Sequence, residues 1–521
     1  MTDAEAATTD DTRRHLTHVA RGGALGLVGA AVSAVSGFAL VLVVTNRFSA
    51  ETAGLFFTVT SMFLVLSALA TLGCETGLGR FMLRYEAQGR LGDIPPTLRA
   101  ATRPALVFSV VLAGLLIIFA APLGELVGLD ADEGPSSLRV LAVLLPFATW
   151  NALALAGTRA FGKMSTTVLV EQIARPIAQP VLAWVVSILG AGLLALTLAW
   201  SVPYALAAAV SAVLFRRFLV KRGTLTHTEP TTSTRALRRE FWSFTWPRAI
   251  TRIAQMAIQR LDIIIVAALR SPAEAAVYTA ATRFVALGQF GTQAIQQVLQ
   301  PKFTALLADE HDTSLRGVYQ IATAWSMAIA WPMYVVVASA PVAYLSLFGG
   351  RYESEGVATV LLMAFAMLFA VATGAADTLL LMSGRSTLSL VNSLVALALD
   401  IGLCVWLIPE MGITGAAAAW AVANSVRCLL AVLQTRHTLR IVSFGRPAAI
   451  VAGANFGCIA LPLIGLSFVV SLDVATLALA CAVCAPLYIG ALWLGRRQLM
   501  LGVLRDLVRR RGSGSDPFAS S

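Results

Sequence analysis

Long apolar runs separated by short polar connections dominate the chain and predict an all-α polytopic membrane protein. Most runs reach the roughly 20 residues that a helix needs to cross the hydrocarbon core of a bilayer. Glycine, proline and charged residues mark their ends. The pattern predicts about 14 transmembrane helices, at 22–45, 53–77, 104–127, 138–158, 166–189, 191–215, 241–269, 274–299, 318–347, 356–382, 386–409, 412–435, 447–470 and 474–495.

The positions of Arg and Lys predict which ends of these helices face the cytoplasm. An even number of spans places both termini on the same side. Assigning the connections alternately to the two sides leaves very few basic residues opposite the termini, namely Arg47, Arg139, Arg270 and Arg351. Cytoplasmic loops carry the excess of Arg and Lys, so both termini are expected in the cytoplasm. Arginine far outnumbers lysine, as in GC-rich bacteria, which indicates a bacterial cytoplasmic membrane.

The two halves of the chain match at one offset, which indicates an internal repeat. A shift of 222 positions aligns 49–56 with 271–278, each at an external turn, and 79–81 with 301–303, each at a cytoplasmic helix end. Six helices per repeat would give both repeats the same orientation. The expected parts are a cytoplasmic N-terminal tail, an N-lobe, a cytoplasmic linker, a C-lobe, two further helices, and an amphipathic segment with a disordered tail, at 1–21, 22–215, 216–240, 241–435, 436–495 and 496–521.

Composition agrees with this interpretation and excludes several functions. The chain is 57% hydrophobic and only 13% charged, with mean hydropathy +0.77, which no soluble fold explains. The net charge of +11 lies in the cytoplasmic connections, so it indicates a membrane surface and not nucleic acid. The chain has no Walker A sequence, zinc-spaced histidines or nucleophile elbow, which excludes an ATP-driven pump and a membrane hydrolase. We expect no metal and no cofactor beyond coupling to Na⁺ or H⁺.

The span at 241–269 carries a polar stripe. Its members follow one another at spacings of four, three, four and three, which puts them on one helix face: Arg248, Arg252, Gln255, Gln259 and Asp262. A charge near the middle of the bilayer costs at least about 2.5–3.5 kcal/mol unless it faces a partner or a wet cavity. The stripe therefore indicates the lining of a central cavity, or else a helix held to its neighbours by buried polar pairs.

The next span carries Arg283 and a row of glutamines. A guanidinium presents a planar fork of donors that suits phosphate. Arg283 is therefore expected to bind phosphate, or else to pair with an acid such as Asp262. The glutamines recur at four, three and four and could follow sugar hydroxyls or bond neighbouring helices: Gln289, Gln293, Gln296 and Gln300.

Other charged residues lie inside predicted spans. Glu171 and Arg175 are four residues apart, a spacing that favours an intrahelical ion pair. Pro176 and Pro180 follow and predict a kink. Arg80 lies at a cytoplasmic helix end, where it could select anions or anchor the helix. Asp377 and Asp400 are expected to couple an ion or to pair with arginine.

Short motifs spread over nearly the whole chain carry a family resemblance. They are Asn46-Arg47 with Glu51 and Gly54, the segment 77–84, Tyr278 with Ala281 and Arg283 leading to Pro301, 347–349 with Tyr352, and Ile408-Pro409 with Gly412 and 415–417. This set resembles the polysaccharide and lipid-linked-oligosaccharide flippase branch of the multidrug/oligosaccharidyl-lipid/polysaccharide (MOP) exporter superfamily.

The resemblance implies two six-helix lobes around a cationic cavity, plus two C-terminal helices. It implies alternating access that moves a polyprenyl-diphosphate-linked glycan to the outer leaflet, with Arg283 at the position of the family's cavity arginine. The residues expected to bind diphosphate and sugars are Arg80, Arg175, Arg248, Arg252, Gln255, Gln259, Arg283, Gln289 and Gln293. Those expected to couple an ion are Glu171, Asp262 and Asp400. Expected partners are the glycan lipid, membrane lipids, and an envelope glycan polymerase or glycosyltransferases, with the protein itself a monomer.

Two other functions remain open. A drug/cation antiporter of the same superfamily would share twelve of the helices, but its cavity should be rich in acids and aromatic residues. A membrane glycan polymerase or ligase should carry a large external loop with polar catalytic residues, and the predicted external connections are short. The prevalence of Arg and Gln in the predicted cavity favours an anionic glycolipid.

Overall fold

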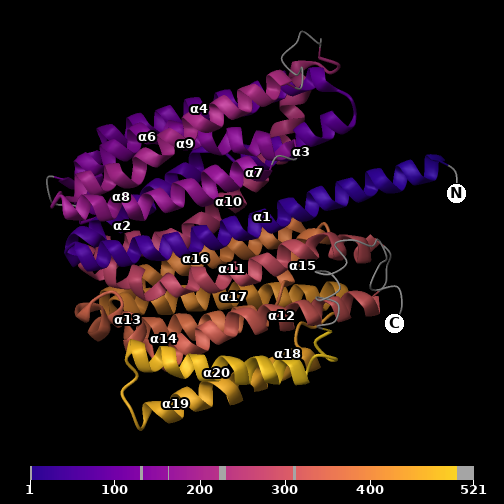
Figure 1. The fold of residues 1–521 in the computed structure, drawn as a ribbon. Coiled ribbons are helices and arrows are strands. Elements are labelled where there is room, and N and C mark those ends of the chain that lie inside the picture. Colours follow the sequence, from indigo (N-terminus) through magenta and orange to yellow (C-terminus); the bar gives the residue numbers. More distant parts are fainter. Residues whose placement is uncertain (1–2, 129–132, 162–163, 222–229, 309–311, 501–521) are drawn as a thin grey trace.

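The computed structural model describes residues 3–128, 133–161, 164–221, 230–308 and 312–500, and within these ranges every regular element is a helix (Figure 1). Side chains are described from residue 25 onward, apart from 294, 297–302, 304–308 and 312–314. The side chain of Gln300 and the tail at 501–521 therefore lie outside the described residues.

The first half of the chain forms a series of long helices with short connections. They are α1 (Asp3–Arg47), α2 (Ala50–Ala70), α3 (Cys74–Ala87), α4 (Ile94–Ile118), α5 (Ala120–Leu126), α6 (Glu133–Ala160), α7 (Met164–Thr167), α8 (Arg175–Ile188) and α9 (Leu193–Lys221). A single 3₁₀ turn (Leu91–Asp93) precedes α4. A π-helix (Val168–Ala174) joins α7 to α8.

The second half repeats this style. Its helices are α10 (Thr234–Leu269), α11 (Pro272–Ala308), α12 (Asp312–Ser339), α13 (Pro341–Ser346), α14 (Gly350–Ala372), α15 (Ala376–Met382), α16 (Ser386–Met411), α17 (Ile413–Leu439), α18 (Arg446–Asn455), α19 (Leu461–Ser467) and α20 (Val474–Leu494). A second π-helix (Phe456–Ala460) joins α18 to α19.

Eleven helical segments of the described chain are long and apolar enough to cross a membrane, so the protein is a multi-pass membrane protein. The predicted spans at 166–189, 241–269 and 274–299 are not among them. These segments hold the arginines and glutamines singled out in the sequence, and those residues lower their apolarity. Both α10 and α11 are nevertheless far longer than the roughly 20 residues that a span requires.

Two segments that the sequence predicts to be a tail and a linker are partly helical. The segment 216–240 was expected to be a linker, but α9 reaches Lys221 and α10 already begins at Thr234. Ser233 caps α10 by accepting a hydrogen bond from the amide of Ala236, and Leu237 is buried. The backbone of the predicted tail at 1–21 is helical from Asp3 and continues directly into the first span. Both extensions occur where the sequence shows no apolar run.

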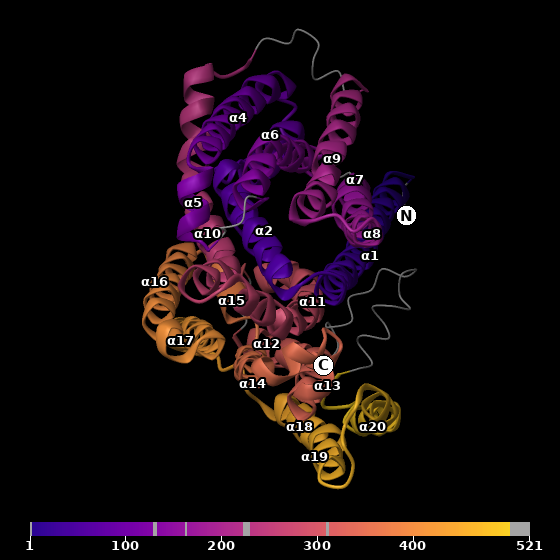
Figure 2. The same ribbon diagram turned by 90° about the vertical axis from the view of Figure 1, so that its left-hand side faces the viewer.

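The helices of the two halves pair in the same way. In the first half α1 packs on α8, α2 on α6, α6 on α9, and α8 on α9. In the second half α10 packs on α16, α11 on α14, α14 on α17, and α16 on α17. Figure 2 shows the first-half helices on one side, α11–α17 beside them, and α18–α20 farthest from the first half. The halves meet where α2 packs on α10 and α11, and where α1 packs on α11.

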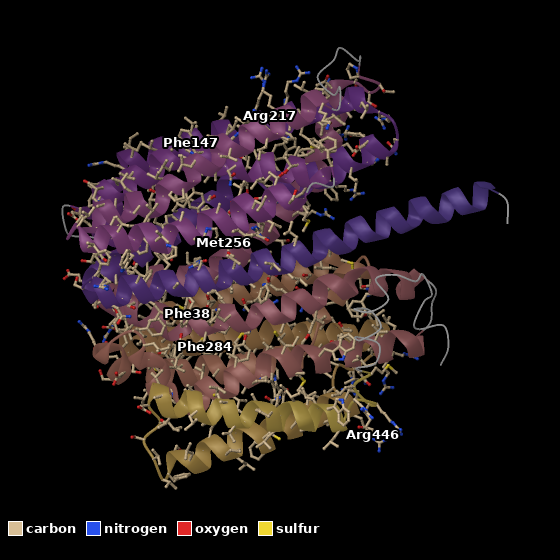
Figure 3. All side chains as sticks on the ribbon, viewed as in Figure 1. Phe38, Phe147, Arg217, Met256, Phe284 and Arg446 are labelled. Atoms are coloured by element: carbon tan, nitrogen blue, oxygen red, sulfur yellow. The ribbon has the colours of Figure 1, made fainter. Side chains whose placement is uncertain are left out.

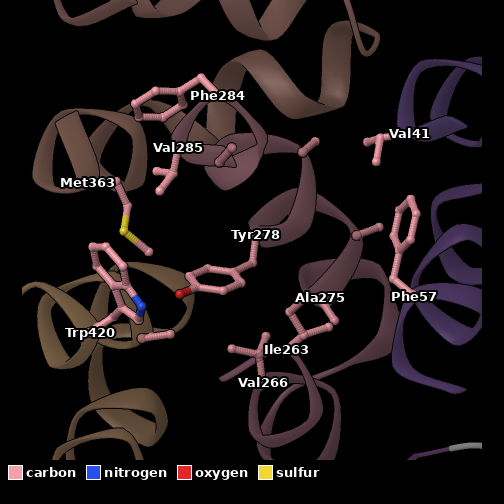
Figure 4. Packing of buried hydrophobic residues seen from close by; sticks show 14 of the residues in the cluster. Val41, Phe57, Ile263, Val266, Ala275, Tyr278, Phe284, Val285, Met363 and Trp420 are labelled. Carbon is pink, nitrogen blue, oxygen red and sulfur yellow. The ribbon is translucent and has the colours of Figure 1, made fainter. Parts of the chain in front are cut away.

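The core between the halves is built around Tyr278, which is fully buried. Figure 4 shows its ring among apolar side chains of the second half, with the hydroxyl directed toward Trp420 of α17. Phe57 of α2 and Val41 of α1 belong to the same cluster. Labelled arginines such as Arg217 and Arg446 lie at the end of the molecule from which α1 starts (Figure 3).

Candidate functional site

A cavity of about 410 Å³ between the two halves contains three arginines. Its walls come from α1, α2, the π-helix, α8, α9, α10 and α11. Arg175, Arg260 and Arg283 all line it, and among the described residues no Asp or Glu does. We call it the arginine cavity.

Arg283 of α11 lies in this cavity without a partner. Among the described residues its guanidinium makes neither an ion pair nor a hydrogen bond. Gly37 of α1 lies beside the guanidinium: a Cβ added there would make an ordinary contact of 4.0 Å with its Nη2 atom. The sequence left open a pair between Arg283 and Asp262, but Asp262 accepts its hydrogen bond from Tyr278 instead. Arg283 is thus available to a ligand.

Arg260 of α10 was not singled out in the sequence. It follows Gln259 directly and points away from the predicted stripe, into the arginine cavity. Its Nε atom is buried and has no hydrogen-bond partner. It lines the same cavity as Arg283, so the cavity contains two positive charges without an ion-pair partner among the described residues. The sequence did contain a signal for Arg260, because it lies only a few residues before the apolar run 263–269. A charge at that depth in the membrane is costly unless it faces a partner or a wet cavity.

Arg175 is held more tightly than the other two arginines. Its Nη2 atom lies 2.5 Å from Oε1 of Glu171, and its guanidinium stacks over the ring of Tyr204 at 4.4 Å. Glu171 also accepts a hydrogen bond of 2.8 Å from Asn151. The intrahelical ion pair that the spacing favours is present. The π-helix that ends at Ala174 lies where the sequence predicts a kink, and such distortions are frequent at functional sites.

A second cavity, of about 350 Å³, lies within the second half of the chain. It is lined by five glutamines from α10 and α11, namely Gln255, Gln259, Gln289, Gln293 and Gln296. Asp377 and Arg427 face each other at its edge, with 3.8 Å between Oδ2 and Nη1. We call it the glutamine cavity. Gln293 lines both cavities, so they adjoin.

The remaining arginines of the stripe lie elsewhere. Arg248 and Arg80 stack on the ring of Phe244, at 3.6 Å and 4.1 Å from its centroid. Arg252 is exposed and lines neither cavity. Glu75, which precedes Arg80, pairs with Arg159 at 3.7 Å. The stripe is therefore divided: Arg248 and Arg252 lie outside both cavities, whereas Gln255 and Gln259 line the glutamine cavity.

The carboxylate of the stripe is buried between α10, α11 and α16. Asp262 accepts a hydrogen bond of 2.6 Å from Tyr278 and one of 2.8 Å from its neighbour's amide. Asp400 lies on α16, which packs on α10, and is 1% exposed. Sγ of Cys404 lies 3.9 Å from Oδ1 of Asp400. Asp262 and Asp400 therefore lie on helices that pack on each other, while Glu171 pairs with Arg175, which lines the arginine cavity.

A multi-pass helical protein with polar cavities inside its bundle has the architecture of a secondary transporter. The chain belongs to the polysaccharide biosynthesis protein family, whose model matches residues 19–307. A search of curated proteins found no match to the sequence.

Solved structures of transporters share the fold of this chain. The lipid II flippase MurJ in an inward closed conformation has a TM-score of 0.67 at 10% identity, over 90% of this chain and 99% of that one. An inward-facing multidrug resistance MATE family transporter has a TM-score of 0.61 at 15% identity, over 78% of this chain and 95% of that one. A MOP superfamily transporter from Pyrococcus furiosus has a TM-score of 0.54 at 15% identity, over 81% of this chain and 95% of that one.

Proposed function

We propose that the protein is a flippase that moves a polyprenyl-diphosphate-linked oligosaccharide or polysaccharide precursor from the inner to the outer leaflet of the bacterial cytoplasmic membrane. The observation that carries this proposal is the arginine cavity, in which Arg260 and Arg283 have no acidic partner. Membership of the polysaccharide biosynthesis protein family and the fold of a lipid II flippase support it.

A diphosphate suits the arginine cavity because of its charge and its geometry. Two positive charges in one cavity repel each other. A bound group with two or three negative charges would stabilise both guanidiniums at once. Each guanidinium can bind phosphate oxygens through two parallel hydrogen bonds. The lipid tail would remain in the bilayer while the headgroup occupies the cavity.

The membrane arrangement that we propose has 14 spans with both termini in the cytoplasm. It counts α8 with its π-helix, α10 and α11 as spans, because Arg175, Arg260, Arg283 and the glutamines of these helices line the two cavities. The recurrence of the same helix pairs in both halves supports two six-helix lobes of equal orientation. Alternating access would then be a rocking of these lobes around the arginine cavity.

Contacts between the halves close the external end. The backbone of α2 at Gly54 approaches Pro272 so closely that an added Cβ would lie 1.6 Å from the Pro272 carbonyl oxygen. Asn46 donates a hydrogen bond of 2.8 Å to the carbonyl of Leu347. These contacts would have to open when the headgroup is released outside.

Ion coupling, if present, is proposed for the buried carboxylates Asp262 and Asp400, with Na⁺ or H⁺ as the driving ion. A carboxylate pair from α10 and α16 can bind a cation or share a proton. The test is the dependence of transport in proteoliposomes on a Na⁺ or H⁺ gradient. Asp400→Asn should abolish that dependence, and its persistence would exclude this residue from coupling.

A drug/cation antiporter is the second candidate, because a multidrug transporter has the same fold and the protein has buried carboxylates. The arginine cavity disfavours it, since an organic cation would meet three guanidiniums. A glycan polymerase or ligase stays an alternative without a supporting contact. The proposed flippase acts as a monomer between glycosyltransferases and a polymerase.

Binding to the purified protein in detergent tests the proposal. Polyprenyl diphosphate should bind the wild type, and Arg283→Ala should weaken binding roughly 10- to 150-fold, the value of a hydrogen bond to a charged group. The matched control is Arg351→Ala, which removes an exposed arginine paired with Glu355 outside both cavities. Binding of a quaternary ammonium dye in place of the lipid would overturn the proposal in favour of the antiporter.

A further inference from the structure

We propose that the glutamine cavity is a separate subsite for the sugar residue next to the diphosphate, and that it takes an uncharged sugar rich in hydroxyl and amide groups. This inference rests on the proposed function. It adds that the two parts of the headgroup bind in different cavities. Phosphate would occupy the arginine cavity and the first sugar the glutamine cavity.

The charges that line the glutamine cavity cancel. Arg427 and Asp377 are its only charged lining residues among those described. They face each other at 3.8 Å, and Nη2 of Arg427 also donates a hydrogen bond of 2.9 Å to Asn424. A cavity of this kind favours neither an anion nor a cation. It differs in this respect from the arginine cavity, where positive charges are unopposed.

The glutamine cavity offers many free hydrogen-bonding groups. The side-chain amides of Gln255, Gln259 and Gln289 make no hydrogen bond to any described residue, and Gln255 and Gln259 are exposed to the cavity. Each amide supplies two donors and an acceptor. Within one turn of a helix, Gln255 and Gln259 can therefore bind neighbouring hydroxyl or amide groups of one sugar ring. Hydroxyl and amide groups of a sugar can both donate to and accept from these side-chain amides, and neither partner carries a charge.

A break in a membrane helix forms another wall of the cavity. Between α14 and α15 the chain passes through Thr373, Gly374 and Ala375, which all line the cavity. Gly374 has φ of +69°, and an added Cβ would lie 2.2 Å from Oγ1 of Thr323, so only glycine fits there. Irregular backbone at membrane depth is tolerated where it lines a polar cavity. The break thus adds backbone polar groups to the amides.

An aromatic ring completes the lining. Trp420 of α17 is 7% exposed and lines the glutamine cavity. An indole ring has a large apolar surface. The C–H face of a sugar ring is also apolar, while its rim carries hydroxyls. A lining that combines Trp420 with amides suits both surfaces of such a ring.

The two cavities adjoin at Gln293. This arrangement determines which part of the headgroup would lie in each cavity. A sugar linked directly to the diphosphate would have to pass this side chain. The first sugar is therefore the part of the glycan that the second half of the protein can recognise. Later sugars would extend beyond the cavity, whose volume of about 350 Å³ is at the lower end for ligand pockets.

The test compares two lipids: polyprenyl diphosphate, and polyprenyl diphosphate carrying one N-acetylhexosamine. The measured quantity is the ratio of their dissociation constants for each variant. In the wild type the sugar should lower the dissociation constant about fivefold or more, which corresponds to the net free energy of one hydrogen bond. Gln259→Leu and Gln289→Leu, from α10 and α11, should each bring the ratio toward one. Thr251→Val, an α10 variant outside both cavities, should retain the wild-type ratio.

The outcomes separate this inference from the proposed function. If the wild type binds both lipids equally, or if the leucine variants keep the full sugar preference, the subsite is overturned while the flippase assignment stands. If neither lipid binds, the flippase assignment fails and the subsite fails with it. Melting temperatures of the variants, measured alongside, show that a lost preference does not come from a lost fold.

Discussion

Arg260 and Arg283 share a cavity inside the helix bundle, and no described acid lines that cavity with them. Two buried positive charges near each other are unfavourable unless an anion or water compensates them. The buried, unpartnered Nε atom of Arg260 shows that the protein itself does not provide full compensation. At the scale of single residues, this arrangement is the main reason for assigning an anionic substrate.

The first prediction concerns two arginines of α10 that the sequence and the structure treat differently. The sequence placed Arg252 in the binding site and missed Arg260, whereas the structure places Arg260 in the cavity and leaves Arg252 exposed. Arg260→Gln should weaken binding of polyprenyl diphosphate about tenfold or more, and Arg252→Gln should not. Titration of each purified variant with the lipid measures this. The reverse order of effects would contradict the structural assignment.

The second prediction concerns Glu171, which partly neutralises Arg175 at 2.5 Å. Glu171→Gln keeps a hydrogen-bonding group beside Arg175 but removes a negative charge. Binding of polyprenyl diphosphate should therefore tighten roughly threefold at low salt, and the gain should shrink as salt is added. Glu355→Gln, which alters an exposed ion pair with Arg351, is the matched control. Weaker binding by Glu171→Gln would mean that the carboxylate acts mainly by positioning Arg175.

The sequence identified part of the site for a clear reason. Arg283, Gln255 and Gln259 interrupt apolar runs at helical spacing, and polar residues inside a span are costly enough to be informative. The same rule applies to Arg260, but the stripe periodicity drew attention to the neighbouring face of α10. Which face looks into a cavity depends on how α10 packs against α2 and α11, and one sequence does not contain that information.

At the scale of whole elements, apolar runs predicted the helices well where packing against lipid dominates. The last predicted span, 474–495, agrees with α20 to within one residue. The end of the predicted linker is helical because Ser233 caps α10 and Leu237 packs on a local core, so α10 begins before its apolar run. The break at Gly374 could not be predicted, because a lone glycine is common within membrane helices and becomes decisive only through its contact with Thr323.

The third prediction concerns the contact between α2 and α11 at the end of the protein that we propose to be external. Gly54→Ala places a methyl group against the backbone of Pro272, so the helices must separate at that end. The variant should favour an outward-open state. Thr60, buried in the arginine cavity wall, reports this state: in Thr60→Cys, an impermeant thiol reagent added outside should react faster when Gly54→Ala is present.

Controls make the third prediction specific. Gly114→Ala adds a methyl group where no atom lies within 4 Å, so it should not change the labelling rate. The same protein without the Thr60→Cys change gives the background from the six native cysteines. Unchanged labelling of Thr60→Cys in the Gly54→Ala variant would show that this contact does not control the external opening.

At the scale of the whole molecule, the structure combines a cationic cavity between the halves with a neutral, hydrogen-bonding cavity inside the second half. Both cavities are lined in part by α10 and α11, whose predicted spans are not among the eleven segments apolar enough to cross a membrane. The family match covers residues 19–307 and therefore includes both helices. A headgroup made of diphosphate and sugar is the ligand class that we propose for the two cavities together.

The most direct test of this account is translocation in proteoliposomes. Polyprenyl-diphosphate-linked sugar is placed in one leaflet, and its appearance in the other is followed with a sugar-binding lectin that cannot cross the membrane. The account predicts that wild type and Arg351→Ala move the lipid, and that Arg283→Ala and Arg260→Gln are folded but move it at the rate of protein-free liposomes. Translocation by the two cavity variants at the wild-type rate would contradict the role of the arginine cavity.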